Sequence, residues 1–212
     1  MMQMNNEIYL IDCRDLSDPA VFREAYRLVS EERRASADKA RLEEDKRLTL
    51  GAGILEAYVR RLHPSLPRVI HDDAGKPFFE GSPCHLSISH AHDYAMLGIG
   101  SAPLGVDLEY YYRDYESILR HFFLEEEQRY IDAAPSPRAA FFELWSRKEA
   151  YIKRNKPTDI RKFSVLAAEE GMEYLSFPLE EAYSCVAYVP KGQRTTWHCA
   201  GALEYLEELK ER

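Results

Sequence analysis

The chain has 212 residues, of which 45% are hydrophobic and 30% charged, and its formal net charge is −8 with histidine neutral. This acidic balance argues against a nucleic-acid partner, because affinity for nucleic acid depends on basic groups that neutralise phosphates. No stretch approaches the ~18 apolar residues of a membrane helix, and the first residues lack the pattern of a signal peptide. We therefore expect a cytoplasmic protein without a membrane partner.

Hydrophobic periodicity in the first half changes from strand to helix and back to strand. The predicted elements there are, in chain order, a strand at 7–13, a helix from Asp18-Pro19, a long helix over about 43–62, a turn around Ala74-Gly75 and two strands within 85–100.

The second half has the same order, with strand, then helices, then strands. Its predicted elements are a strand at 103–111, helices near 117–122, from Leu124 and from Pro135 to about Asn155, strands at 162–167, 185–189 and 195–203, and a helix from Tyr205. Elements mixed without strict βαβ alternation favour an α+β fold with mainly antiparallel sheets. We expect two similar lobes, 1–102 and 103–212, each a small sheet packed with a long helix.

Asp107 and Glu109 stand two positions apart on the predicted strand 103–111. Because alternate side chains of a strand share a face, the two carboxylates point to the same side. Oxygen ligands of this kind suit Mg²⁺, which accepts one or two carboxylates and leaves positions for phosphates and water. The alternative is a solvated polar face on an edge strand.

Glu149 and Lys153 lie one turn apart on the predicted helix that ends near Asn155. The segment from Arg147 to Lys162 holds seven basic residues against two acidic ones, a local excess that would attract phosphates or an acidic partner. An ordinary surface ion pair and a solvated helix end explain the same residues.

Polar side chains near Gly75 and His90 are of the kinds that bind an anion. Lys76 follows a tight turn, and Ser89 and His90 stand together near the end of a strand. A nucleophilic Ser89–His90 pair is geometrically poor, because adjacent strand residues point to opposite faces. His90 and His92 alone make a weak case for a zinc site.

Four motifs taken together carry a family resemblance. They are G-K-P at 75–77, S-I-S-H at 87–90, G-V-D-L-E at 105–109 and W-S-R-K-E-A-Y-I-K at 145–153. In this order and spacing the sequence resembles the Sfp-type 4′-phosphopantetheinyl transferases over about 33–165.

The resemblance implies transfer of the 4′-phosphopantetheine arm of coenzyme A to a serine hydroxyl of an apo acyl or peptidyl carrier protein, with release of adenosine 3′,5′-bisphosphate. It implies a pseudo-two-fold pair of lobes with coenzyme A between them, and the chain length favours a monomer. Whether the carrier serves fatty acid, polyketide or non-ribosomal peptide synthesis stays open.

The resemblance also implies roles for individual residues. Mg²⁺ would be held by Asp107, Glu109 and Glu149. The residues expected at the coenzyme A phosphates are Lys76, Ser89, His90, Lys148 and Lys153, with Arg41 and Arg47 at the 3′-phosphate or adenine. Glu149, or a water held by the metal, is the candidate proton acceptor, with Lys153 orienting Glu149. Glu127 matches a glutamate near the family's site, although a helix N-terminal contact explains it equally well.

Two other functions use the same residues. A metal-dependent phosphohydrolase would need the carboxylates and no protein acceptor, and a non-catalytic coenzyme A or carrier-binding module would tolerate the loss of Asp107. The intact D-x-E and W-x-x-K-E motifs favour the transferase.

Overall fold

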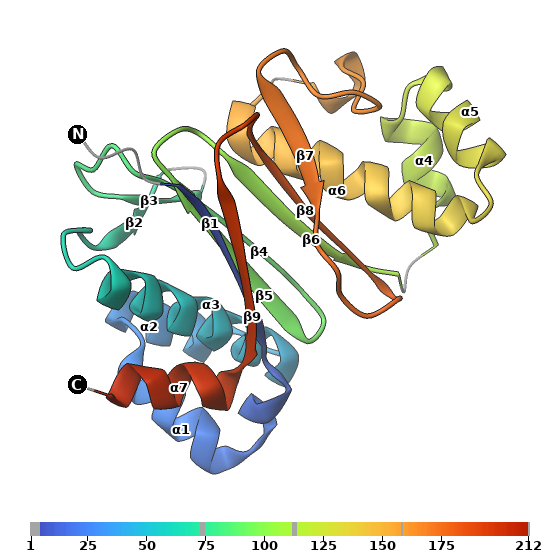
Figure 1. Cartoon of the computed structure of the whole chain (residues 1–212). Coiled ribbons are helices and arrows are strands. Elements are labelled where there is room, and N and C mark those ends of the chain that lie inside the picture. Colours follow the sequence, from blue (N-terminus) through green and yellow to red (C-terminus); the bar gives the residue numbers. More distant parts are fainter. Residues whose placement is uncertain (1–4, 73–74, 112–113, 158, 212) are drawn as a thin grey trace.

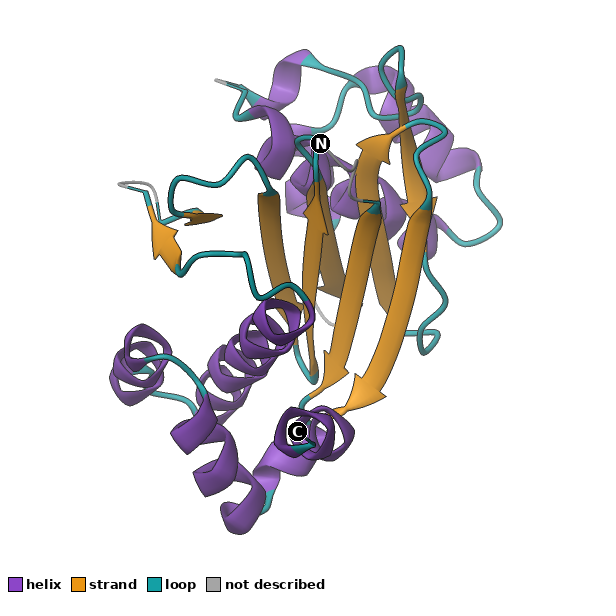
Figure 2. Ribbon diagram, turned by 60° about the vertical axis from the view of Figure 1, so that its left-hand side comes forward, coloured by secondary structure: helices purple, strands orange, loops and turns teal. Residues whose placement is uncertain are grey.

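The structure, a computed structural model, describes residues 5–72, 75–111, 114–157 and 159–211. Its first sheet has the strand order β4-β5-β1-β9, and Figure 2 shows these strands side by side. The strands are β1 (Asn6–Asp12), β4 (His85–Ala91), β5 (Tyr94–Gly100) and β9 (Thr195–Gly201). β1 runs antiparallel to β5 and parallel to β9, so the first and last strands of the chain are neighbours.

Helices cover one face of this sheet. They are α1 (Pro19–Leu28), α2 (Glu31–Lys39), α3 (Glu43–Leu62) and α7 (Ala202–Lys210). α3 packs on β1 and β5, and α1, α2 and α7 pack against α3. Ile11 of β1 and Leu55 of α3 are fully buried in the core between these layers. A short hairpin of β2 (Val69–His71) and β3 (Pro77–Phe79) connects α3 to β4.

A second sheet, in the order β6-β8-β7, packs on the other face of the first. Its strands are antiparallel: β6 (Gly105–Tyr110), β7 (Met172–Ser176) and β8 (Tyr183–Pro190). Ile8 and Met96 of the first sheet share a core with Val106 and Ala187 of the second. The result is four layers, helices, sheet, sheet and helices (Figure 1).

The outer helices of the second half are α4 (Glu116–Phe122), α5 (Glu125–Ala133) and α6 (Pro137–Asn155). Short 3-10 turns lie at Arg14–Ser17 and Ile160–Lys162. α6 packs on β6 and β8, which places the second half of the helix against the strand of the D-x-E motif. In the described part of the chain, no helix combines the length and the apolar character needed to cross a bilayer.

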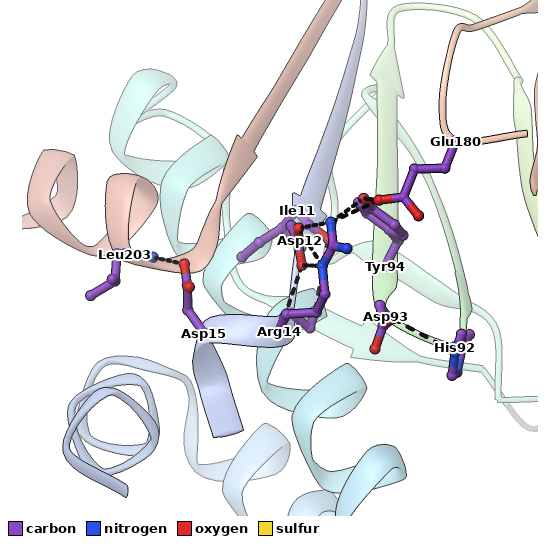
Figure 3. A network of polar contacts seen from close by, with 10 residues as sticks. Ile11, Asp12, Arg14, Asp15, His92, Asp93, Tyr94, Glu180 and Leu203 are labelled. Carbon is purple, nitrogen blue, oxygen red and sulfur yellow. Dashed lines mark hydrogen bonds and ion pairs between the residues drawn. The ribbon is translucent and has the colours of Figure 1, made fainter. Parts of the chain in front are cut away.

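A polar network joins the end of β1 to the loop before β8 (Figure 3). The Arg14 guanidinium contacts Asp12 at 2.5 Å and Glu180 at 2.9 Å. The Tyr94 hydroxyl accepts a hydrogen bond from Arg14 at 2.8 Å and donates one to Glu180 at 2.9 Å. Because Glu180 precedes the second sheet's central strand, the network adds polar contacts between the two sheets to their shared apolar core, to which Tyr94 belongs.

The α+β architecture with mainly antiparallel sheets is confirmed. The division at 102/103 differs from the observed connectivity, because residues 195–210 return to the first sheet as β9 and α7. The pseudo-two-fold relation stays a prediction, and Ala74 of the expected turn lies outside the described residues.

The strand predicted at 162–167 was wrong. Most of this segment is irregular, and two of its backbone groups are satisfied by side chains in place of a neighbouring strand. Lys148 donates to the Phe163 carbonyl oxygen at 3.0 Å, and the Val165 N–H donates to Glu127 at 2.9 Å. α2 was not predicted, because only Ala37 of its side chains is buried and the helix has no apolar stripe.

Candidate active site

A cleft of about 420 Å³ lies where β4, β6 and α6 meet. Its lining residues are Arg33, His71, Gly75, Pro77, Ile88, Ser89, His90, Asp107, Leu108, Glu109, Glu149 and Lys153. A cavity of about 440 Å³ adjoins it and shares Pro77 and Lys153, and one of about 600 Å³ shares His90 and Glu109. The cleft therefore draws residues from all four sequence motifs and opens towards further space on two sides.

Three carboxylates line this cleft. Val106 and Leu108 of β6 are buried in the core between the sheets, so the alternation of the strand directs Asp107 and Glu109 to the opposite side. Glu149 reaches the cleft from α6, and its pKa is raised by burial and by the negative charge of Asp107. The Trp145 indole N–H donates to Glu109 Oε1 at 3.0 Å. The arrangement concentrates negative charge where a cation would be stabilised.

Gly105 explains how β6 comes so close to α6. A Cβ atom added at Gly105 would lie 1.9 Å from the carbonyl oxygen of Ala150. Only glycine permits this approach, which brings the strand of Asp107 against the helix turn that carries Glu149. The glycine at the start of the G-V-D-L-E motif thus has a packing role.

The two oxygens of Asp107 have different surroundings. Oδ1 accepts from Lys153 Nζ at 2.7 Å and from the Ser89 hydroxyl at 3.0 Å. Oδ2 is buried and has no hydrogen-bond partner among the residues that the structure describes. An unpartnered buried carboxylate oxygen is costly unless a cation or water satisfies it.

These residues fit a magnesium ion. No three His, Cys, Asp or Glu side chains of the described residues are already gathered around one point. Mg²⁺ does not need such a cage, because it binds through one or two carboxylates and takes its other ligands from phosphates and water. The buried Oδ2 of Asp107, for which the described residues offer no hydrogen bond, and the carboxylate of Glu149 in the same cleft meet that requirement.

The position of Lys148 differs from the sequence-based expectation that it contacts a phosphate of coenzyme A. Its side chain is fully buried and forms an ion pair with the equally buried Glu127, with 2.9 Å between Nζ and Oε2. Burial lowers the Lys148 pKa and the Glu127 contact opposes this shift. A lysine enclosed in this way does not reach a phosphate in the cleft, so Lys148 and Glu127 are structural residues. Glu127 also accepts from the Leu124 N–H at 2.9 Å at the start of α5.

The expected phosphate contacts divide into separate groups. His90 and Lys153 line the cleft, and Lys76 lines the adjoining cavity. Lys76 Nζ donates to the backbone carbonyl of Lys153, which ties the β2–β3 hairpin to α6. Burial and the charge of Lys156 lower the Lys76 pKa. Ser89 lines the cleft, but its hydroxyl is hydrogen-bonded to other groups of this protein.

The two arginines proposed from the N-terminal stretch do not line the cleft. Arg41 is exposed in the bend before α3, and Arg47 lines a separate cavity of about 340 Å³ beside α1. Arg33 of α2 and His71 of β2 occupy the cleft wall instead. Arg33 is held there by a bidentate contact with Glu56, at 2.6 and 3.1 Å. The sequence signal for these two residues was weak, because neither belongs to one of the four motifs.

The basic segment 147–162 is not one continuous surface. Six of its seven basic residues pair with acidic residues in different places: Arg147 with Glu143, Lys148 with Glu127, Lys153 with Asp107, Lys156 with Asp72, and Arg161 and Lys162 with Asp159. The seventh, Arg154, donates to the Pro103 carbonyl oxygen at 3.1 Å. The local charge excess counted from the sequence is therefore divided among the core, the cleft and the surface.

Comparison with known proteins identifies the family. A family model described as the 4′-phosphopantetheinyl transferase superfamily matches residues 103–200. The chain is 30% identical to 4′-phosphopantetheinyl transferase psf-1 of Bacillus pumilus over 189 residues, 83% of this chain and 81% of the relative. The chain belongs to the 4′-phosphopantetheinyl transferase superfamily. The resemblance inferred from the four motifs is thereby confirmed.

Two further members of the superfamily match at comparable identity. 4′-Phosphopantetheinyl transferase Sfp of Bacillus subtilis (strain 168) is 28% identical over 162 residues, 71% of either chain. 4′-Phosphopantetheinyl transferase HetI of Nostoc sp. is 30% identical over 123 residues, 52% of either chain. The superfamily match at 103–200 includes β6 and α6, and hence the three carboxylates of the cleft.

Proposed function

We propose that this protein transfers the 4′-phosphopantetheine arm of coenzyme A to a serine hydroxyl of an apo acyl or peptidyl carrier protein and releases adenosine 3′,5′-bisphosphate. The observation that carries the proposal is the pairing of Asp107 and Glu149 in a cleft that Lys153, His90 and Arg33 also line. Carboxylates for a divalent ion beside cationic and imidazole groups for phosphates match the needs of a pyrophosphate substrate.

Phosphoryl-type transfer requires positioning and charge neutralisation more than covalent help from the protein. Held by Asp107, Glu109 and Glu149, Mg²⁺ would supply positive charge to the pyrophosphate as the nucleotide leaves. Lys153 and Arg33 would add positive charge at the same cleft, and His90 would offer a ring nitrogen to a phosphate oxygen. Lys76 would stiffen the wall through its bond to α6.

The attacking serine must lose its proton during transfer. Glu149 is our candidate acceptor, because burial and the charge of Asp107 raise its pKa and so strengthen it as a base. Lys153 lies close enough to lower the same pKa and thus to moderate that effect. In this proposal the phosphorus–oxygen bond to the nucleotide breaks as the serine oxygen bonds to phosphorus, and the proton passes to Glu149.

Intact-protein mass spectrometry of an apo carrier tests the proposal directly. The carrier is incubated with coenzyme A, Mg²⁺ and this protein, with EDTA in a parallel sample. We expect the mass of one phosphopantetheine to be added with Mg²⁺ and not with EDTA. Asp107→Asn should abolish the gain, whereas Glu116→Gln, an exposed change on α4, should preserve it.

The same experiment separates the alternatives. Coenzyme A binding without modification of several unrelated carriers would favour a binding module. Release of a nucleotide or phosphate without any carrier would favour a phosphohydrolase. Either result would overturn the proposed function.

A further inference from the structure

Serine hydroxyls join the two sheets at the cleft. β4 and β6 belong to different sheets and are not neighbours in either ladder. The Val106 N–H donates to Ser87 Oγ at 3.0 Å, and the Leu108 N–H donates to Ser89 Oγ at 3.2 Å. Both serines are nearly enclosed, with 2% and 7% of their surfaces exposed. The D-x-E strand is thus attached to β4 by side chains in place of backbone carbonyls.

Ser89 differs from Ser87 in having two additional partners. Its hydroxyl donates to Asp107 Oδ1 at 3.0 Å and accepts from Lys153 Nζ at 2.8 Å. A serine hydroxyl offers one hydrogen and two lone pairs. With Leu108 N–H and Lys153 as donors and Asp107 as acceptor, all three positions of Ser89 are used. No hydrogen-bonding capacity is left for a phosphate of coenzyme A.

The bonds at Ser89 act on the orientation of Asp107. Ser89 and Lys153 both hold Oδ1, whereas Oδ2 of the same carboxylate is buried and has no partner in the described part of the chain. Two directional bonds on one oxygen restrict rotation of the carboxylate about its Cβ–Cγ bond. The other oxygen is therefore kept in one place with its lone pairs available.

We propose that Ser89 is a positioning residue that orients Asp107 so that Oδ2 is available to the divalent cation, and that it does not bind coenzyme A. This inference rests on the proposed function, because it assumes that Asp107 is a metal ligand. It replaces the phosphate contact expected for Ser89 from the sequence. Residues that orient a metal ligand commonly contribute 10–100-fold to metal affinity.

Titration of Mn²⁺ into the coenzyme-free protein, followed by electron paramagnetic resonance of the free ion, tests this role. Ser89→Ala should weaken Mn²⁺ binding by about 10–100-fold, and Ser89→Thr, which keeps the hydroxyl, should recover most of the affinity. Ser87→Ala is the matched control, because it removes an equivalent bond to a β6 amide without touching Asp107. Its Mn²⁺ affinity should stay close to that of the wild type.

Kinetics at saturating metal provide the second measurement. The KM for coenzyme A should be almost unchanged in Ser89→Ala, whereas a phosphate contact would make it rise. A raised KM with normal Mn²⁺ affinity would overturn the inference, as would equal losses of Mn²⁺ affinity in the Ser87 and Ser89 variants. If Ser89→Ala does not fold, Ser89→Cys provides the same comparison with a much weaker hydrogen-bond donor.

Failure of the proposed function would look different. A wild-type protein that binds no Mn²⁺ and modifies no carrier would overturn the proposed function together with this inference. A wild-type protein that does both, with Mn²⁺ affinity unaltered by Ser89→Ala, would overturn only the role of Ser89.

Discussion

Lys148 and Glu127 form an ion pair in which neither side chain has any exposed surface, although the two residues come from different helices, α6 and α5. Lys148 Nζ also lies 5.2 Å from the ring centroid of Phe123 and 5.0 Å from that of Phe163. The pair anchors the irregular segment after α6 to the helices. A buried charge that loses its partner is strongly destabilising.

Replacing Glu127 alone should therefore reduce the stability of the protein. We expect Glu127→Ala to lower the free energy of unfolding by about 3–5 kcal/mol, because it leaves the Lys148 ammonium buried and unpaired. Urea denaturation followed by circular dichroism measures this change. The double variant Glu127→Leu with Lys148→Met should regain much of the loss, and a single variant as stable as the wild type would contradict the structural role.

Glu149→Gln should affect turnover much more than binding. The amide keeps the size of the side chain but cannot accept the serine proton, so kcat should fall by about 100-fold or more. The dissociation constant for coenzyme A, measured by calorimetry, should change by far less. Equal losses in kcat and coenzyme A affinity would argue that Glu149 is only part of the binding surface.

Gly105→Ala should disturb the contact between β6 and α6. The new methyl group would overlap the Ala150 carbonyl oxygen, so strand or helix must shift. Overpacking of this kind costs about 1–3 kcal/mol, and the shift would also displace Asp107, two residues away. Thermal unfolding and Mn²⁺ titration of the same sample measure both effects. A melting temperature and an Mn²⁺ affinity equal to those of the wild type would show that α6 accommodates the methyl group without displacing Asp107.

Metal removal should change stability only when the carboxylates are intact. Asp107 and Glu149 line the same cleft, and burial together with the charge of Asp107 raises the Glu149 pKa, so two negative charges are held close together when both groups are ionised. A bound cation would relieve this repulsion, so Mg²⁺ should raise the melting temperature of the wild type relative to EDTA. The Asp107→Asn variant should have the same melting temperature with Mg²⁺ as with EDTA. A shift of wild-type size in the variant would place the stabilising ion elsewhere.

The sequence predicts the candidate site well where the periodicity of one strand or helix places residues of suitable chemistry on the same face. The alternation around Asp107 predicted the strand and the shared face of its carboxylates, and the helical spacing of Glu149 and Lys153 predicted their common side. Lys148 lies next to Glu149 in the same motif, yet the two face opposite environments. That difference depends on Glu127, a residue 21 positions earlier, and no periodicity within α6 reveals it.

The rest of the fold depends on contacts between segments far apart in the sequence, which a local pattern does not reveal. The strand pattern of 195–203 was recognised, but nothing in it indicates that β9 would lie beside β1, almost the whole chain away. Arg33 was missed as a cleft residue because α2 has almost no apolar side to mark it as a helix. The pattern of 162–167 predicts a strand, but Lys148 and Glu127 bond to backbone groups of this segment instead. The local pattern does not reveal these two partners.

The placement of β1 between β5 and β9 has a consequence for synthesis on the ribosome. β1 is made well before β9, so one of its two neighbours in the sheet is missing until Gly201 has been made. Until then Leu10, which is fully buried in the finished sheet, belongs to a strand with one open hydrogen-bonding edge. The first sheet is therefore complete only after Gly201 has been made, and the nascent chain must keep that edge from pairing with other chains until then.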